Sequence, residues 1–480
     1  MSDRVTRRGF IKAAVLAVGA LTSADLVAAC GQGGQPATAT TKPAVPAATK
    51  PAAPANVAPT TGAASTTQAA GFDWKRFSGA NIRLLAIHNP TIDLWPKRIQ
   101  EFEQLTGIKV TFDLLELNAM KSKLGVEMMG GATDLDMFLT WPKQEGLKFL
   151  RAGWYEVLDD KYLKDPTMAS PDLDLADFME SSLEGSKIDG KLIGLPNGVA
   201  YSLLCYRKDL FQAAGLNVPE TWDDFEAAAK KLHNPSGQVY GAAYRGQANA
   251  AAGIMRVWAA SYGGNWFTSN GDPDFASDEN LKAWDVESRV LRLYGPPGAI
   301  SLDMNTAPEM FAQGKAAMII EPQTNMTGIF DKSTSRVLDK VGFAVTPAGP
   351  KGHTPILFNA ALAISSRSKN KGAAWFFIQW AMNKANSLEL AMSGITPSRK
   401  STLQEAKFKD GPAKEQPEWW KIFSDTDKVA VADWLPPMVA AQEARDVYGK
   451  IIEAGIQGQD IKAAALEVNK EMKDLMTKTQ

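Results

Sequence analysis

Apolar residues downstream of residue 80 alternate between short continuous runs and a helical spacing. Residues 82–87 (IRLLAI) form such a run, which predicts a buried strand. A helical spacing then places apolar side chains on one face, at Trp95, Ile99, Phe102 and Leu105. Gly107 stands where a left-handed C-terminal cap belongs, so we expect the helix to end there.

The same alternation continues with a strand at 110–115, a helix at 120–129 and a strand at 135–139. Strands that alternate with helices predict an α/β fold with a parallel sheet covered on both faces. Ligands of such sheets bind beyond the carboxyl ends of the strands. The candidate positions are therefore His88 and Asn89, after the first strand, and Trp141, after the third.

Two further elements follow from local chemistry. Thr221 is placed to cap a helix whose first turn carries favourable acidic residues, and a short buried strand at 316–320 leaves Glu321 and Gln323 in the loop after it. We expect tryptophans at helical positions to pack in the core, namely Trp222, Trp284, Trp375 and Trp380.

The first 29 residues read as an export signal. Arg7 and Arg8 precede an apolar run at 13–21, and the stretch TRRGFIK resembles the twin-arginine signal of bacteria. The residues before Cys30 (VAA) resemble a lipobox, with a chance cysteine after an Ala-rich signal as the alternative. Acyl chains on Cys30 would anchor the protein to a membrane. Residues 30–72, rich in Ala, Thr and Pro, lack the bulky apolar residues of a core and predict a disordered tether.

Composition narrows the function classes. Lys and Arg number 52 and Asp and Glu 53, giving a formal net charge of −1, so we expect no nucleic-acid partner. No segment after the signal is long and apolar enough to span a bilayer. The 2 cysteines and 3 histidines show no zinc spacing. We expect no metal and no cofactor, and a monomer.

Five segments, in this order, carry a family resemblance: 190–196 (GKLIGLP), 202–211 (SLLCYRKDLF), 214–225 (AGLNVPETWDDF), 311–318 (FAQGKAAM) and 394–399 (GITPSR). Together they resemble the extracellular solute-binding proteins, family 1, of bacterial ABC sugar importers, which include maltose-binding protein. The resemblance covers the chain from about residue 81 to its C-terminus.

This resemblance implies a type II periplasmic-binding-protein fold, with two α/β lobes joined by a hinge. The N-terminal lobe would comprise 73–199 plus 353–397, and the C-terminal lobe 200–352 plus 398–480. A sugar held in the interlobe cleft would stabilise the closed state and be delivered to the transmembrane subunits of an ABC permease. The resemblance implies a binding protein and not an enzyme.

A buried sugar needs polar partners for its hydroxyls and aromatic faces for its C–H surfaces. For the loop residues Trp141, Trp266 and Trp434, ligand contact and simple burial are equal alternatives; Asn197 and Asn359 could instead form turns, and Glu321 could pair with an arginine. The candidate ligand-binding residues are His88, Asn89, Trp141, Asn197, Tyr201, Asn265, Trp266, Glu321, Gln323, Asn359 and Trp434.

The sequence departs from the family pattern in two places. Phe358-Asn359-Ala360 stands where many relatives have a glycine pair, and Glu321-Pro322-Gln323-Thr324 where they carry Gly and Trp. The expected stacking residue is missing, which counts against an ordinary maltodextrin ligand.

Other classes remain open. A polyamine site would need several carboxylates, and a glycerophosphodiester site Arg, Lys or helix N-termini; a peptide is a third possible solute. An anchored glycosidase would need paired carboxylates, such as Glu321 with Glu116 or Asp136. No nucleophile elbow or phosphate loop supports an enzyme.

Overall fold

The computed structural model describes residues 71–479. The predicted export signal, Cys30 and nearly all of the predicted tether lie outside the described residues. Within residues 71–479, no helix is long and apolar enough to cross a membrane.

One sheet runs through both lobes, in the strand order β2-β1-β3-β10-β7-β8. Its first three strands pair in parallel, whereas the remaining pairs are antiparallel. These strands are β1 (Asn81–Ile87), β2 (Lys109–Leu115), β3 (Met137–Thr140), β7 (Leu195–Arg207), β8 (Met318–Pro322) and β10 (Leu357–Ser365), with β4 (Tyr155–Glu156) and β9 (Val341–Ala344) at its sides; β5 (Lys187–Ile188) and β6 (Lys191–Leu192) form a small separate sheet.

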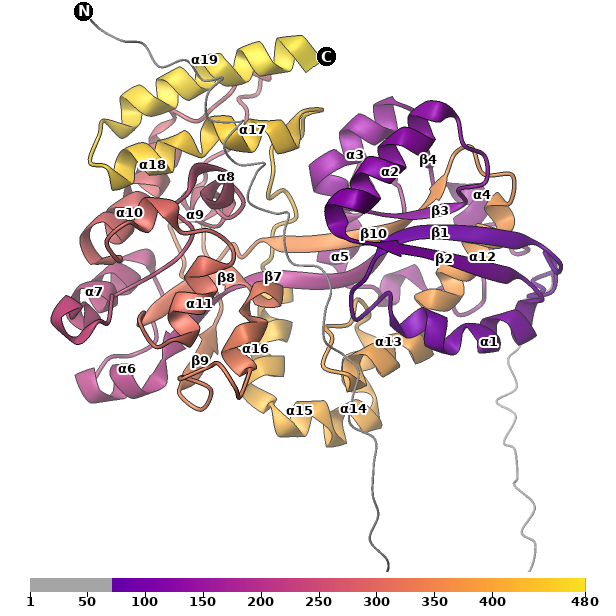
Figure 1. Cartoon of the computed structure of the whole chain (residues 1–480), viewed down its shortest axis with the longest axis horizontal. Coiled ribbons are helices and arrows are strands. Elements are labelled where there is room, and N and C mark those ends of the chain that lie inside the picture. The colour runs from indigo at the N-terminus through magenta and orange to yellow at the C-terminus, as the bar shows by residue number, and fades with distance from the viewer. Residues whose placement is uncertain (1–70, 480) are drawn as a thin grey trace, which may run out of the picture. The chain divides into compact units, whose positions relative to one another are not determined.

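The expected parallel sheet is therefore right for β1–β3 and wrong for the rest. The alternation of strand and helix predicts pairing only between strands that follow one another in the chain. β10 pairs with β3 and with β7 across more than 150 residues of intervening sequence, which no local pattern records. Figure 1 shows β7 and β10 running from one lobe into the other.

The helices cover these strands (Figure 1). In chain order they are α1 (Leu94–Thr106), α2 (Leu117–Gly130), α3 (Pro142–Arg151), α4 (Asp160–Leu163), α5 (Glu180–Gly185), α6 (Lys208–Ala214), α7 (Trp222–Leu232), α8 (Ala248–Ala252), α9 (Arg256–Tyr262) and α10 (Asp278–Tyr294). They continue with α11 (Thr306–Ala312), α12 (Lys371–Ala381), α13 (Lys384–Met392), α14 (Ala406–Asp410), α15 (Pro412–Glu415), α16 (Pro417–Asp427), α17 (Ala441–Tyr448), α18 (Lys450–Ile456) and α19 (Ile461–Thr479). A 3-10 helix, η4 (Gln323–Phe330), follows β8.

Local chemistry predicted several helix ends correctly. Gly107 closes α1 with a φ of 73°, and its N–H donates to the carbonyl of Glu103. Thr221 caps α7 in a reciprocal capping box with Asp224. Leu105, expected on the buried face of α1, is instead exposed, because only one stripe of the helix meets the sheet.

Each lobe has its own apolar core. Around β1–β3 the core draws on residues between Phe72 and Leu195 and between Leu362 and Met382. A second, larger core draws on residues between Met179 and Met472, where Trp222 stacks on Trp258 at 4.9 Å between ring centroids. The four helical tryptophans expected in the core are all buried. Separate cores agree with a division into two lobes. The residue boundaries given above for these lobes stay a prediction.

Arg399, the last residue of the segment 394–399, links distant parts of the chain. Its buried guanidinium donates to the carbonyls of Met382 (2.7 Å) and Leu173 (3.0 Å) and pairs with Asp177 (3.1 Å). Three distant segments are thereby joined at one planar group, which can saturate several acceptors at once. Arg399 therefore has a structural role at the end of this segment.

Asp134 and Asp136 flank a strand in the sequence, and this position predicts that both lie at the surface. For Asp136 the prediction is wrong, because its carboxylate is buried and accepts from the backbone N–H of Arg83 (2.9 Å) and the hydroxyl of Ser368 (2.5 Å). Asp134, two residues earlier, is exposed as expected.

Glu287 is a buried carboxyl in the core of the larger lobe. It lies on α10, is fully buried, and neither carboxyl oxygen has a hydrogen-bond partner among the described residues. Burial raises the pKa of Glu287 well above its ordinary value. The group therefore folds in its neutral form, because an unpaired buried charge is far more costly.

We expect Glu287→Gln to remove a pH-dependent loss of stability. With a raised pKa in the folded state, the carboxyl is ionised only in the unfolded chain as pH rises above its ordinary value, so stability falls with rising pH by up to about 1.4 kcal/mol per unit. In urea unfolding, the free energy of unfolding of the variant relative to that of the wild type should increase between pH 4 and pH 8. Glu309→Gln, on the exposed side of α11, should follow the wild type. Parallel curves for Glu287→Gln and wild type would contradict this assignment.

Candidate functional site

A cavity of about 690 Å³ lies between residues of the two lobes, and we call it the central cavity. Its lining comes from the loops after β1 and β3, from the first halves of β7 and β10, from η4, and from residues between 392 and 420. Its position past the carboxyl ends of β1 and β3 is the one that α/β sheets favour for ligands. Its volume is in the range of small-molecule sites, about 300–1,000 Å³.

A bulge on β7 turns consecutive residues towards this cavity. Asn359 pairs with Val199 and Ala361 with Pro196, so β7 has one more residue than β10 between the two pairs. Gly198 occupies the bulge with a φ of 84°, a conformation that glycine adopts without strain. Residues 197–200 and 358–360 therefore line the cavity together, although a regular strand would alternate them.

The structure brings five of the predicted binding residues to the central cavity: Asn89, Trp141, Asn197, Gln323 and Asn359. They come from five separate stretches of chain: the loops after β1 and β3, then β7, η4 and β10. Six predicted residues do not line it: His88, Tyr201, Asn265, Trp266, Glu321 and Trp434.

Three amide side chains in the cavity lack part of their hydrogen bonding. Asn197 is only 5% exposed, and neither its Oδ1 nor its Nδ2 has a partner among the described residues. Asn359 donates from Nδ2 to the hydroxyl of Ser186 (2.9 Å), whereas its Oδ1 is unpartnered. Each buried polar group without a hydrogen-bond partner lowers the free energy of unfolding by about 1–3 kcal/mol. A bound solute that supplies hydrogen-bond partners would recover that free energy.

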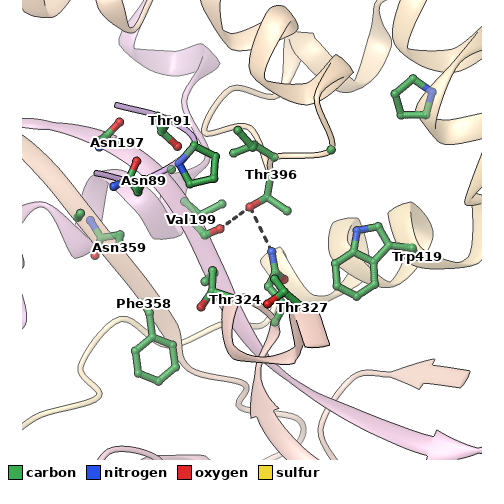
Figure 2. Close-up of a pocket in the computed structure, with 18 of the residues that line it drawn as sticks. Asn89, Thr91, Asn197, Val199, Thr324, Thr327, Phe358, Asn359, Thr396 and Trp419 are labelled. Carbon is green, nitrogen blue, oxygen red and sulfur yellow. Dashed lines mark hydrogen bonds between the residues drawn. The ribbon is translucent and has the colours of Figure 1, made fainter. Parts of the chain in front are cut away.

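Gln323 is the third of these amides, and its orientation is fixed. Its Nε2 donates to the hydroxyl of Thr396 (3.1 Å), which in turn donates to the carbonyl oxygen of Val199. Figure 2 shows this chain of hydrogen bonds in the middle of the cavity. The amide oxygen of Gln323 is left without a partner among the described residues.

The lining of the central cavity is almost uncharged. Glu415, which is exposed, is the charged residue among the described residues that line it; the rest are amides, hydroxyls and apolar groups. A polyamine site would need converging carboxylates, and a phosphate site would need cations. The arrangement suits a neutral solute with many hydroxyl groups.

Trp141 is the predicted tryptophan that reaches the cavity. It precedes α3, where its backbone N–H donates to the side chain of Glu145 (2.9 Å), and it is partly exposed. The ammonium of Lys121 lies 5.0 Å from the centre of its ring. These contacts hold the ring at the end of β3, so it offers a fixed aromatic surface.

Tyr201 and Glu321 have partners inside the protein. The hydroxyl of Tyr201 donates to Asp427 (2.6 Å), and burial, followed by this carboxylate, raises the pKa of Tyr201. Glu321 binds Arg245 through both carboxyl oxygens (2.9 and 3.0 Å from Nε). Burial raises the pKa of Glu321, and Arg245 opposes that shift. The expected loop position of Glu321 is wrong, since β8 continues to Pro322 and keeps this residue in the sheet.

The other four predicted residues lie outside the cavity lining. Trp266 is buried and donates from its indole N–H to the carbonyl of Asp433 (2.8 Å), and Trp434 is buried against Phe358 at 4.8 Å between rings. Asn265 is exposed, and His88 is exposed with Nδ1 3.0 Å from Asp93. For the two tryptophans, the alternative of simple burial describes their place in the structure.

Sequence reasoning missed several residues of the lining: Thr91, Thr324, Thr327, Phe358, Thr396 and Trp419. Thr396 stands inside the segment 394–399, so its neighbourhood was singled out but its hydroxyl was not. Trp419 lies on α16, where tryptophans are ordinarily assigned to the core. No spacing signal distinguishes a helical tryptophan that faces a cavity from one that packs inside.

The carboxylates considered for a glycosidase do not form a pair in the structure. Glu321 belongs to the ion pair with Arg245, and Asp136 to the hydrogen bonds before β3. Glu116 is exposed at the start of α2. Each of the three carboxylates thus has a separate place in the described structure, and none of them lines the central cavity.

Comparison with known proteins identifies the class. Residues 89–387 match the family described as bacterial extracellular solute-binding protein. That match spans more than half of the chain, which therefore belongs to this family. The members of the family are binding proteins and not enzymes.

Relatives support the same class over longer stretches. The mannitol-binding protein of Pseudomonas aeruginosa is 33% identical over 324 residues, which cover 65% of this chain and 71% of the relative. The erythritol/L-threitol-binding protein of Mycolicibacterium smegmatis is 27% identical over 485 aligned positions, 93% of each chain. A solved ABC transporter solute-binding protein of Agrobacterium radiobacter in complex with ribitol is 27% identical, with a TM-score of 0.68, covering 83% of this chain and 99% of that one. The fold is thus the two-lobed type II periplasmic-binding-protein fold.

We expect Asn197→Leu to separate stability from binding. The variant removes an unpartnered buried amide, so the free energy of unfolding should stay level or rise by about 1 kcal/mol, while solute affinity falls at least tenfold. Urea unfolding and calorimetric titration measure the two effects.

Asn386→Leu is the matched control. This buried amide is fully partnered, since it accepts from Arg98 (2.5 Å) and donates to the carbonyl of Trp380 (2.6 Å). We expect its loss to cost about 1–3 kcal/mol of stability. Equal destabilisation by both substitutions would show that Asn197 has a partner in solution and speak against its role.

Proposed function

We propose that this protein is the solute-binding lipoprotein of an ABC importer for a neutral polyol or small sugar. The observation that carries the proposal is the central cavity, almost uncharged, with unpartnered amides at Asn197, Gln323 and Asn359. Relatives named for mannitol and for erythritol/L-threitol, and a structural neighbour that holds ribitol, support a polyol. The missing stacking residue after β8 agrees with a solute other than a maltodextrin.

The proposed contacts follow from the lining. Asn89, Asn197 and Asn359, together with Gln323 and Thr396, would exchange hydrogen bonds with hydroxyl groups, and Trp141 would cover a C–H surface. Of the other candidates, Tyr201, Trp266, Glu321 and Trp434 would support the lobes from within, and His88 and Asn265 carry no proposed role.

Capture would proceed by lobe closure. A solute that contacts residues from both lobes binds the closed state better than the open state, and this differential affinity shifts the population. The closed form would then dock on the transmembrane subunits of an ABC permease, which would release the solute for import. Capture itself would alter no covalent bond of the solute.

The proposed location rests on the N-terminal sequence. Arg7 and Arg8 would direct export through the twin-arginine route, and Cys30 would carry the lipid that holds the protein at the outer face of the cell membrane. Residues 30–72 would give the lobes reach from that anchor.

A panel of solutes tests the proposed ligand class. We expect calorimetric titration of the purified protein to detect binding of D-mannitol, ribitol, erythritol or a monosaccharide, and none of spermidine or glycerophosphocholine, because the lining that the structure describes has no cation and a single, exposed carboxylate at Glu415. Small-angle scattering with the bound solute should show a smaller radius of gyration. Binding of the amine or the phosphodiester alone would contradict the proposal.

The anchor has its own test. In a bacterial host, Cys30→Ser should abolish labelling with radioactive palmitate and move the protein from the membrane fraction to the soluble exported fraction, because Cys30 is the cysteine that directly follows the signal. Cys205→Ser is the matched control, since Cys205 is buried in the larger lobe with its sulfur 3.1 Å from that of Met326. Persistent labelling of Cys30→Ser would contradict the lipobox assignment.

A further inference from the structure

The central cavity has two chemically different ends. Asn89, Thr91, Asn197 and Asn359 form one end, which we call the amide end. Phe330 and Trp419, whose rings are neighbours, form the other, which we call the Trp419 end. Met392 approaches Gly411, next to Pro412 at the start of α15, and both Met392 and Pro412 line the cavity. Figure 2 shows the asparagines on one side and Trp419 on the other, with Thr324, Thr327 and Thr396 between them.

Trp419 is held in place by other aromatic rings. Its ring meets Phe343 edge to face, with centroids 4.8 Å apart and planes at 80°, and Phe330 at 6.1 Å. Phe330 itself stacks on Phe343 at 5.7 Å. This cluster fixes the wall of the cavity before any solute arrives, so little conformational entropy is lost on binding.

The apolar surface at this end is left open. Phe330 is 39% exposed and Met392 40% exposed, and both line the central cavity. Large apolar side chains that stay exposed in a concave site mark a surface that another apolar group covers. Because this surface is continuous with the amide end in one cavity, a single solute can reach both.

The distribution of unpartnered polar atoms decides what kind of group would lie there. Among the lining residues that the structure describes, the unpartnered buried atoms belong to Asn197, Gln323 and Asn359, and none to the Trp419 end. Glu415 and Gln416 also line the cavity near Trp419, and both are exposed, so water can satisfy their polar atoms. An apolar group placed there would therefore leave no buried polar atom unpaired, whereas a second sugar ring would have only these two side chains as partners.

We propose that the physiological solute is a polyhydroxylated molecule that carries an apolar or aromatic substituent, with the hydroxyls at the amide end and the substituent against Trp419. The inference rests on the proposed function for its polar half. A plain polyol would fill the amide end and leave Phe330, Met392 and Trp419 uncovered. A short alkyl or aryl ether or glycoside would cover both.

The experiment compares each plain compound with its substituted form. The probes are ribitol and D-mannitol against their 1-O-benzyl ethers, and methyl against phenyl glucoside, all titrated calorimetrically into the full-length protein. We expect the substituted compound to bind about tenfold tighter than its parent, with a more negative heat-capacity change, because the added ring loses its contact with water. Maltose tests a second sugar ring in the same place.

The variants test where the gain arises. In Trp419→Leu the ratio of the two affinities should fall to about one, and Met392→Thr, at an exposed side chain, should lower it without a risk to folding. Trp154→Leu is the matched control: this tryptophan is also partly exposed but packs on Phe149 outside the cavity, so the ratio should stay at the wild-type value.

Several results would overturn the inference. Substituted compounds that bind no tighter than their parents would do so, as would a gain that survives in both Trp419→Leu and Met392→Thr. Maltose binding that exceeds every substituted compound and depends on Trp419 would assign this end to a second sugar ring instead. If plain compounds bind and substituted ones do not, only the present inference fails; if neither kind binds, the proposed function fails as well.

Discussion

The antiparallel pairing of β7 with β10 is the interaction on which the site depends. These strands connect the two lobes, and their pairing register, Tyr201 with Leu357 to Leu195 with Leu362, brings Asn197 and Asn359 to one cavity. The bulge at Gly198 is part of the same arrangement, since it presents successive residues of β7 to the cavity. A one-residue change of register would send these side chains to the opposite face of the sheet. Backbone hydrogen bonds between the two strands thus position Asn197 and Asn359.

Buried polar groups in the two lobes differ in whether their hydrogen bonds are satisfied inside the protein. Arg399 and the Arg245–Glu321 pair are buried with their hydrogen bonds made inside the protein, so they stabilise one arrangement of chain segments. Asn197 is equally buried but unpartnered, which costs stability. Such a cost is expected where a bound solute supplies the missing partner.

Local physics made much of the fold predictable. The apolar run of β1, the glycine that ends α1 and the Thr221 cap of α7 depend on neighbours within a few residues, so the sequence records them directly. The antiparallel half of the sheet was missed, because it pairs strands far apart in the chain. The same distinction holds for the site. Asn89 and Trp141 could be predicted because they follow strands that the local sequence pattern identifies. The hydrogen-bond partners of Tyr201 and Glu321 could not, because they are Asp427 and Arg245, which are distant in the sequence. Whether a polar side chain meets a solute or a distant partner is a long-range property.

The unpartnered amides also bear on how such a protein can switch. In a closed state without solute, Asn197 and the oxygens of Gln323 and Asn359 are hidden from water and unpaired, at about 1–3 kcal/mol for each group. Opening of the lobes would let water reach these groups and recover that free energy, so the empty cavity favours the open state. A solute with hydroxyls in the right places removes the same cost while the lobes stay closed. The difference between the empty and filled cavity is then the differential affinity that a population shift requires, and it arises from neutral groups alone. Because no charge pair is involved, we expect this coupling to persist at high ionic strength, where screened ion pairs would lose their effect.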